Sequence, residues 1–265
     1  MHQIGFIGCG NMGSAMVGGI LAKGLYKKED ILVSQLHPEG AAKTRERFGV
    51  EAVLDNCLVA REAKLLFLAV KPQFYEEVLA QIQGELTKEH VVVGLAPGKT
   101  TSYLKEHCGG MGSFARFMPN TPAQVGAGMT AICLGEGITP EIEKTLVAIA
   151  ESFGQAQVIP ERLMDAAGAV GGCSPAFVYM LIEAMADAAV LEGMPRPMAY
   201  RFAAQTCLGA ASMVMETGKH PGELKDMVTS PGGTTIEGVR TLEKEGFRGA
   251  VMEALIACAE KGKGL

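Results

Sequence analysis

The chain has 265 residues, 48% of them hydrophobic, so it is long enough for two modest domains with a sizeable buried core. Its net charge is −5 and it has no basic block, which argues against a nucleic-acid partner. Its seven scattered cysteines form no CxxC pair, which indicates a reduced, cytoplasmic protein rather than a disulfide framework. We expect no signal peptide and no membrane partner, because the first apolar run is a short strand and no apolar run reaches membrane-spanning length.

The N-terminus carries a glycine-rich turn between a short apolar run and a helical pattern. Residues 4–13 have the sequence IGFIGCGNMG, and the helical pattern follows directly. In a dinucleotide-binding fold, Gly8 permits the tight turn, Gly10 lets the backbone approach a pyrophosphate, and Gly13 lets the helix pack close to the strand. The pyrophosphate would lie on the free N–H groups at the start of the helix. The sequence therefore predicts a nucleotide site here; the alternative is a glycine-rich turn that binds nothing.

Strand and helix patterns alternate through the rest of the first half. Strands are expected at 31–34, 50–53, 64–70, 91–95, 114–117 and 129–133, and helices at 38–48, 56–63, 72–83 and 101–107. The run at 64–70 is almost continuously apolar, which is typical of a buried parallel strand. This alternation predicts a doubly wound parallel sheet, with ligands at the carboxyl ends of its strands.

The end of the second expected strand bears on the choice of cofactor. An NAD site usually has an acid there for the ribose hydroxyls, but the residues after Ser34 include no acid until Glu39. A carboxylate would repel a 2′-phosphate, so its absence favours NADP, and Ser34 could hydrogen-bond that phosphate. No arginine adjoins Ser34 to pair with the phosphate, so NADH stays open as an alternative.

From about residue 160 the patterns are helical only. Helices are expected at 163–171, 175–191, 197–216, 235–244 and 248–261. Helices this apolar are expected to bury one face against a second copy of the chain. The alternative is that these faces pack on the first domain of the same chain. Glu183 and Asp187 lie four residues apart, so they share one face of the helix at 175–191. We interpret them as a polar stripe rather than an acid–base pair or metal ligands, and no metal site is expected.

The segment 229–235 has the sequence TSPGGTT and precedes an expected helix. Glycines and hydroxyls at a helix N-terminus form a cradle for an anion, and a carboxylate suits it because no cation is needed. The alternative is an ordinary capped helix start.

Together these segments resemble the pyrroline-5-carboxylate reductase family over the whole chain. The resemblance rests on IGFIGCGNMG at 4–13, AVKP at 69–72, RFMPNTP at 116–122, GGCSPAF at 171–177 and HPGELKDMVTSPGGTT at 220–235. It implies a Rossmann NAD(P)-binding domain, which we assign to residues 1–159, followed by an all-helical dimerisation and substrate-binding domain at 160–265. The implied reaction is the last step of proline biosynthesis, in which NAD(P)H reduces 1-pyrroline-5-carboxylate to L-proline.

The resemblance also implies roles for individual residues. The cofactor, NADPH or NADH, would be bound by Gly8, Cys9, Gly10, Asn11, Met12, Gly13, Ser34, Asn56, Ala69, Val70, Lys71, Pro72, Leu95, Ala96 and Pro97. The substrate carboxylate would be bound by Ser230, Pro231, Gly232, Gly233, Thr234 and Thr235. Thr235, nearest the ring nitrogen, is the leading catalytic candidate. Lys71 is a second, although an isolated lysine is more simply a solvated cap. A protonated cyclic imine is already electrophilic, so a strong general acid is not essential.

The family further implies a homodimer whose helical domains interlock to form the site, and such dimers often assemble into decamers. Two other functions remain as alternatives. A β-hydroxyacid dehydrogenase typically uses a lysine on a helix of its second domain, and the helix at 175–191 contains none. A non-catalytic nucleotide-sensing protein would have no need of the hydroxyl-rich segment at 229–235.

Overall fold

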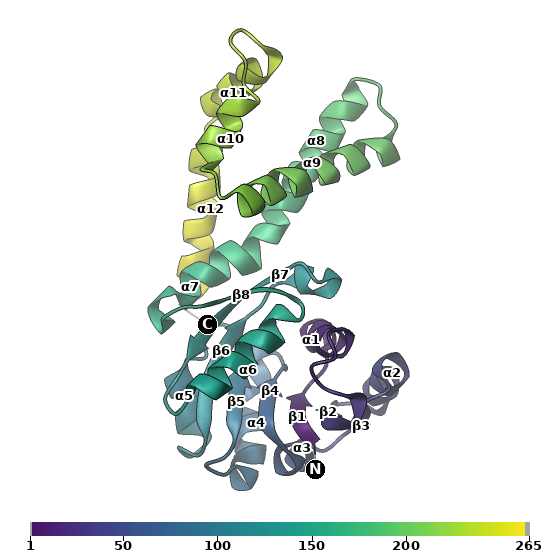
Figure 1. The fold of residues 1–265 in the computed structure, drawn as a ribbon, viewed down its shortest axis with the longest axis vertical. Coiled ribbons are helices and arrows are strands. Elements are labelled where there is room, and N and C mark those ends of the chain that lie inside the picture. The colour runs from purple at the N-terminus through teal and green to yellow at the C-terminus, as the bar shows by residue number, and fades with distance from the viewer. Residues whose placement is uncertain (1, 263–265) are drawn as a thin grey trace. The chain divides into compact units, whose positions relative to one another are not determined.

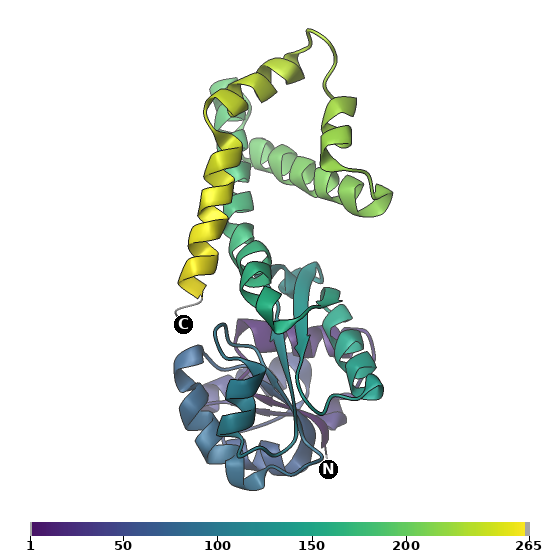
Figure 2. The same cartoon turned by 90° about the vertical axis from the view of Figure 1, so that its left-hand side faces the viewer.

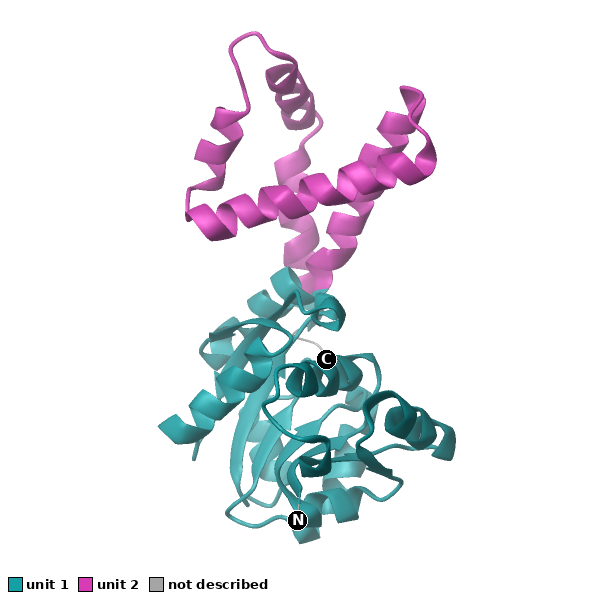
Figure 3. Ribbon diagram, turned by 45° about the vertical axis from the view of Figure 1, so that its right-hand side comes forward, with its two compact units in different colours: residues 1–172, 259–265 teal, residues 173–258 magenta. Residues whose placement is uncertain are grey.

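The computed structural model describes residues 2–262. Their contacts divide the chain into two compact units, which Figure 3 shows in different colours. The first comprises Met1–Gly172 and Ala259–Leu265, and the second comprises Cys173–Cys258. The first unit is an α/β sheet domain and the second is all helical, so the predicted fold class is confirmed.

The first unit is built on an eight-stranded sheet in the order β3-β2-β1-β4-β5-β6-β7-β8. The strands are β1 His2–Ile7, β2 Ile31–Ser34, β3 Glu51–Val53, β4 Ala63–Leu68, β5 Val91–Gly94, β6 Ser113–Met118, β7 Gly128–Leu134 and β8 Gly154–Val158. The chain runs outward from β1 to β3 and then returns to place β4 on the other side of β1. Ligands of open α/β sheets bind at such a reversal, outside the carboxyl ends of the strands.

Helices cover both faces of this sheet, as Figures 1 and 2 show. They are α1 Asn11–Ala22, α2 Pro38–Phe48, α3 Asn56–Glu62, α4 Tyr75–Ile82, α5 Thr101–His107, α6 Pro140–Glu151 and α7 Met164–Ala167. Short 3-10 helices span Lys28–Asp30, Pro72–Phe74, Gln83–Glu85, Thr121–Val125 and Glu161–Leu163, and a π-helix spans Gly168–Cys173.

Successive residues of β1 belong to two separate hydrophobic cores. Phe6 belongs to the core that also contains Met16 of α1, whereas Ile7 belongs to the core that contains Leu79 of α4. The side chains of Phe6 and Ile7, which are neighbours on β1, are both fully buried. Because neighbouring side chains of a strand point to opposite faces, the continuous apolar strands of the sequence are explained by burial on both faces.

The prediction of a fully parallel sheet is wrong at one strand. β7 runs antiparallel to β6, while every other neighbouring pair within the described residues is parallel. Only residues 119–127 connect β6 to β7, which is too short for the crossover that a parallel pair needs. α6 and β8 were also not predicted. β8 has the sequence GQAQV and none of its residues is fully buried, so it lacks the apolar run that indicates an interior strand.

The second unit consists of α8 Ser174–Leu191, α9 Arg196–Thr217, α10 Pro221–Met227, α11 Thr234–Lys244 and most of α12 Phe247–Gly262. The sequence patterns indicated all of these except α10, a short helix in a stretch for which no helix was predicted. α8 and α9 pack against each other, yet Ala186, Ala199 and Ala203 are the only buried residues on them. Large apolar side chains are exposed instead, including Met180, Leu191, Phe202, Leu208, Met215 and Met252.

By length and composition alone, the continuous helical segment Glu161–Leu191 could cross a membrane. It has 31 residues with a mean hydropathy of 1.4, so the expectation that no apolar run reaches that length is wrong. Only 6% of its most apolar window is buried. Its apolar surface is therefore available for contact with a partner.

Candidate active site

The glycine turn after β1 has the geometry that the sequence predicted. Gly8 has a φ of +88°, and a Cβ there would lie 2.9 Å from the Ala69 carbonyl oxygen. A Cβ on Gly13 would lie 3.1 Å from the Gly8 carbonyl oxygen. Gly10 differs, because a Cβ there would meet nothing within 4 Å. The turn itself thus requires Gly8 and Gly13, whereas Gly10 keeps a space outside it open.

α1 begins beside that space without a side-chain cap. Its N-cap residue is Gly10, and no side chain accepts from the N–H groups of the first turn. No acidic residue lies in the first turn either. Such a helix start attracts an anion through its free N–H groups and its dipole, so it fits a pyrophosphate.

A cavity of about 490 Å³ adjoins this turn at the carboxyl ends of β1, β2 and β4. It is lined by Gly8, Cys9, Gly10, Ser34, Gln35, Leu36, Leu54, Asn56, Ala69, Val70, Lys71, Phe74, Glu77, Val78 and Gln81. Predicted cofactor-binding residues from four separate segments, 8–10, 34, 56 and 69–71, therefore meet in one place. Cys9 is buried, and burial raises the pKa of its thiol, which fits a packing role rather than a nucleophile.

A chain of side-chain hydrogen bonds crosses one wall of this cavity. The buried Ser34 hydroxyl donates to Asn56 Oδ1 at 2.6 Å, and Asn56 Nδ2 donates to Gln81 Oε1 at 2.8 Å. Gln81 Nε2 then donates to Glu77 Oε1 at 3.2 Å. Sequence reasoning identified Ser34 and Asn56 but missed Gln81 and Glu77. Their spacing of four on an amphipathic helix is ordinary, and only packing brings α4 to α3.

Tyr75 joins the ends of two strands at the same rim. Its hydroxyl donates to the Leu68 carbonyl at 2.7 Å and accepts from the N–H groups of Leu95 at 2.7 Å and Ala96 at 3.0 Å. The side chain is fully buried, and this burial raises the pKa of the Tyr75 hydroxyl. Tyr75 therefore fixes the loop 95–97, which was predicted to contact the cofactor, relative to the end of β4.

Lys71 lies at the mouth of the cavity. It is exposed, and its carbonyl accepts from Phe74 N–H at 3.0 Å where the 3-10 helix Pro72–Phe74 begins. It therefore caps a turn through its backbone and is also one of the residues that line the cavity.

The segment 116–122 is fixed by polar contacts within the first unit. Arg116 is 3% exposed and forms an ion pair with Glu161, which also accepts from Thr101 Oγ1 at 2.8 Å. Burial opposes ionisation of Glu161, but the hydrogen bonds from Thr101 and Arg116 outweigh it and lower the pKa of that carboxyl. The Asn120 side chain donates to the Gly171 carbonyl and accepts from Met129 N–H, each at 2.9 Å.

In the second unit, α11 also begins without a side-chain cap. Its N-cap residue is Gly233, whose N–H donates to the Ser230 carbonyl at 3.1 Å. Gly232 has a φ of +68°, which glycine adopts readily. Thr234 and Thr235 are both exposed in the first turn. The Ser or Thr side-chain cap considered as the alternative is therefore not formed, because no side chain accepts from this helix start.

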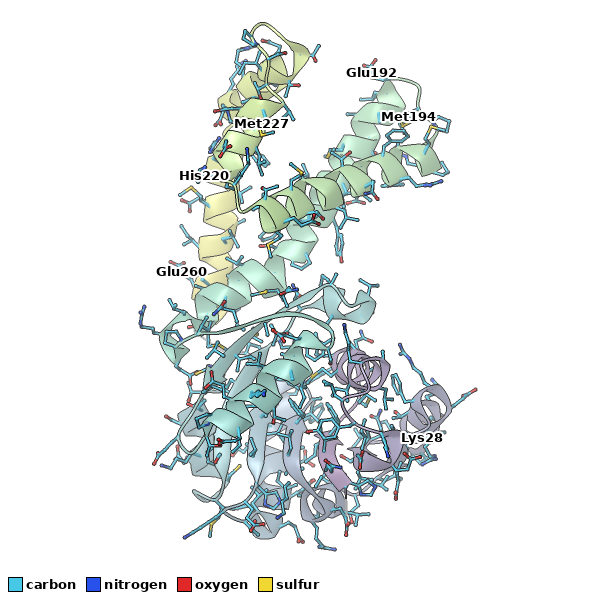
Figure 4. All side chains as sticks on the ribbon, viewed as in Figure 1. Lys28, Glu192, Met194, His220, Met227 and Glu260 are labelled. Atoms are coloured by element: carbon cyan, nitrogen blue, oxygen red, sulfur yellow. The ribbon has the colours of Figure 1, made fainter. Side chains whose placement is uncertain are left out.

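Other polar side chains of the second unit have structural partners. His220, labelled in Figure 4, caps α10 by accepting from Gly222 N–H at 3.1 Å. Asp187 is exposed and forms an ion pair with Arg196, and Glu183 is exposed on the same helix, in agreement with a polar stripe. Within residues 2–262, no cluster of three or more His, Cys, Asp or Glu is arranged to hold a metal ion.

Two family models match this chain, one in its first half and one in its second half. Residues 3–98 match the family described as NADP oxidoreductase, coenzyme F420-dependent. Residues 161–265 match the family described as pyrroline-5-carboxylate reductase dimerisation. The first range contains the glycine turn and the cavity, and the second contains the segment 229–235.

Relatives that match over nearly the whole chain include proteins named pyrroline-5-carboxylate reductase. The chain is 49% identical to the pyrroline-5-carboxylate reductase of Escherichia coli, over 99% of this chain and 98% of that protein. It is 44% identical to the enzyme of the same name from Methanosarcina acetivorans, over 100% and 98% of the two chains. The solved Plasmodium falciparum pyrroline carboxylate reductase with NADP bound matches with a TM-score of 0.89 and 32% identity, over 99% and 97% of the two chains. The chain belongs to the pyrroline-5-carboxylate reductase family of NADP-dependent oxidoreductases.

Proposed function

We propose that this chain reduces 1-pyrroline-5-carboxylate to L-proline with NADPH, as the last step of proline biosynthesis. The observation that carries the proposal is a feature common to both units. α1 and α11 each begin at a glycine with no side-chain cap, one beside a cavity and the other within a hydroxyl-rich turn. Two uncapped helix starts suit the two anionic groups of this reaction, the cofactor pyrophosphate and the substrate carboxylate.

The cofactor side of the proposal fits the residues present. Gly8 to Gly13 would bind the pyrophosphate, because the turn leaves N–H groups free and the absent Gly10 side chain leaves room. Ser34 and Asn56 would contact the adenosine ribose, and the segments 69–72 and 95–97 would line the path toward the reacting end. When bound, the reduced nicotinamide supplies the hydride.

The substrate side would be provided by residues 230–235. Several hydrogen-bond donors lie close together in sequence here: the N–H groups at the start of α11 and the hydroxyls of Thr234 and Thr235. Together they could bind the two oxygens of a carboxylate. Thr235 would hold the ring nitrogen. A protonated imine brings its own proton from solution, so this site needs to orient the ring and exclude water rather than supply a strong acid. Lys71 would assist only by its positive charge.

The apolar surface of the second unit supports a homodimer. Phe202, Leu208 and Met180 are exposed on helices that bury little against their own unit, and the match to a dimerisation family covers 161–265. A second copy would cover this surface, including the membrane-length segment, without a bilayer. We further propose domains of residues 1–159 and 160–265, assembly of dimers into decamers, and a cytoplasmic location.

Product analysis tests this function. The purified protein is incubated with 1-pyrroline-5-carboxylate and NADPH that carries deuterium at the transferable position of the nicotinamide. The proposal predicts L-proline with one deuterium at C5. Oxidation of NADPH without deuterated proline, or turnover of a β-hydroxyacid instead, would contradict it.

A further inference from the structure

The cavity at the end of β2 contains a carboxylate that the sequence around Ser34 does not reveal. Glu77 comes from α4 and lines the same cavity as Ser34 and Gln35. Among the described residues that line this cavity, Glu77 is the single acid and Lys71 the single base. An acid is therefore present, although it comes from another element than the second strand.

This carboxylate is held in place but not neutralised. Gln81 Nε2 donates to Glu77 Oε1 at 3.2 Å, and Gln81 is itself held by Asn56 at 2.8 Å. Within residues 2–262, no lysine, arginine or histidine forms an ion pair with Glu77. A neutral amide orients the carboxylate without cancelling its charge, so the charge is felt in the cavity.

The same chain of hydrogen bonds determines what Ser34 offers. Its hydroxyl proton is donated to Asn56 Oδ1 at 2.6 Å, so it is not free to be donated to a ligand in the cavity. A ribose 2′-hydroxyl carries its own proton and does not require one from Ser34. A 2′-phosphate is mostly dianionic at neutral pH and calls for hydrogen-bond donors, so Ser34 could serve it only by giving up the bond to Asn56.

The unpaired charge of Glu77 and the hydrogen bond from Ser34 to Asn56 both disfavour a 2′-phosphate relative to a 2′-hydroxyl. We propose that Glu77, held by Gln81, determines how strongly this enzyme distinguishes NADPH from NADH, by lowering its affinity for the 2′-phosphate. This proposal rests on the cofactor site proposed above. The 2′-phosphate adds charge that Glu77 repels, whereas a neutral hydroxyl does not feel this repulsion. Glu77 therefore reduces the gain in affinity that the 2′-phosphate gives NADPH over NADH.

Direct binding of the adenosine end tests this proposal without turnover. The dissociation constants of adenosine 2′,5′-bisphosphate and of AMP are measured by calorimetry for the parent and for Glu77→Gln. This variant keeps an amide that can bond Gln81 and removes the charge. We expect it to bind the bisphosphate about fivefold more tightly, on the order of one partly screened charge pair, with the AMP constant unchanged. The gain should shrink as salt is raised.

Two further variants make the test specific. Glu76→Gln removes an equal charge from the neighbouring position in the first turn of α4, but Glu76 does not line the cavity. It should leave the ratio of the two constants at the parent value. Glu77→Asp keeps the charge and should also preserve the parent ratio.

The outcomes separate this inference from the proposed function. If the parent binds neither probe, the cofactor site is misassigned and the proposed function fails with it. If the parent binds both probes and Glu77→Gln leaves their ratio unchanged, or Glu76→Gln shifts it equally, the role of Glu77 is overturned while the proposed function stands.

Discussion

The backbone N–H of Ala96 donates to the hydroxyl of Tyr75 at 3.0 Å, so a residue at the start of α4 fixes the loop that follows β5. The same hydroxyl bonds Leu68 and Leu95, and the ring is fully buried. Sequence patterns assign Tyr75 only to a helix. The bond shows that it also sets the shape of the rim where the cofactor is proposed to bind.

Tyr75→Phe is expected to destabilise the first unit by about 2 to 4 kcal/mol, because it leaves buried backbone groups without partners. It should also raise the dissociation constant of NADPH, since the loop 95–97 loses its anchor. Denaturant unfolding and calorimetry measure the two effects. Tyr103→Phe is the matched control, because no hydrogen bond from the Tyr103 hydroxyl is observed within residues 2–262, and it should change neither quantity. Equal stability of Tyr75→Phe and the parent would contradict this account.

Two glycine substitutions in the turn should separate folding from binding. Gly10→Ala places its Cβ in open space, so thermal stability should stay within about 0.5 kcal/mol of the parent. NADPH binding should weaken on the order of tenfold or more, because the methyl group holds the pyrophosphate away from the N–H groups. Gly8→Ala should instead lower stability, since Gly8 has a φ of +88° and lies against Ala69. A Gly10→Ala variant that binds NADPH as tightly as the parent would exclude a pyrophosphate at this turn.

Thr235→Ala tests the substrate end. Loss of a hydrogen bond to a charged ligand should lower kcat/KM for 1-pyrroline-5-carboxylate by about tenfold to a hundredfold, through both a higher KM and a lower kcat. The dissociation constant of NADPH should not change. Thr241→Ala is the control on the same helix, because the Thr241 hydroxyl donates to the Glu237 carbonyl within the helix. Unaltered kinetics in Thr235→Ala would remove Thr235 from the mechanism.

The ion pair of Arg116 and Glu161 predicts a dependence of stability on pH. The pKa of Glu161 is lowered in the folded protein, so its contribution is complete above the ordinary value of 4.5 and is lost as pH falls through the folded pKa. Glu161→Gln should therefore unfold more easily than the parent at pH 7, because it leaves the buried Arg116 charge unpaired. The difference should narrow well below pH 4.5. Unfolding curves at both pH values measure it, and a constant difference would contradict the assignment.

The parts of the fold that depend on local sequence were predictable. The glycine turn, the strand at 31–34 and the helix at 38–48 are encoded by periodicity and by turn residues within each segment, and the structure has β2 and α2 at those residues. The uncapped start of α11 was signalled in the same way, by glycines that directly precede Thr234.

The parts that depend on packing were not predictable. The direction of β7 follows from a connection too short for a crossover, and β8 carries too little apolar character to stand out. Glu77 and Gln81 reach the site only because α4 packs beside α3, which places Gln81 against Asn56 from a distant part of the sequence. A search for an acid at the end of β2 therefore could not find the one that the cavity contains.

The proposed activity is tested by the initial rate at which the protein oxidises reduced cofactor with 1-pyrroline-5-carboxylate, recorded separately for NADPH and NADH. We expect rapid, saturable oxidation of NADPH, with NADH also consumed but at a lower kcat/KM. No oxidation of either cofactor by protein shown to be folded and dimeric would contradict the proposed function.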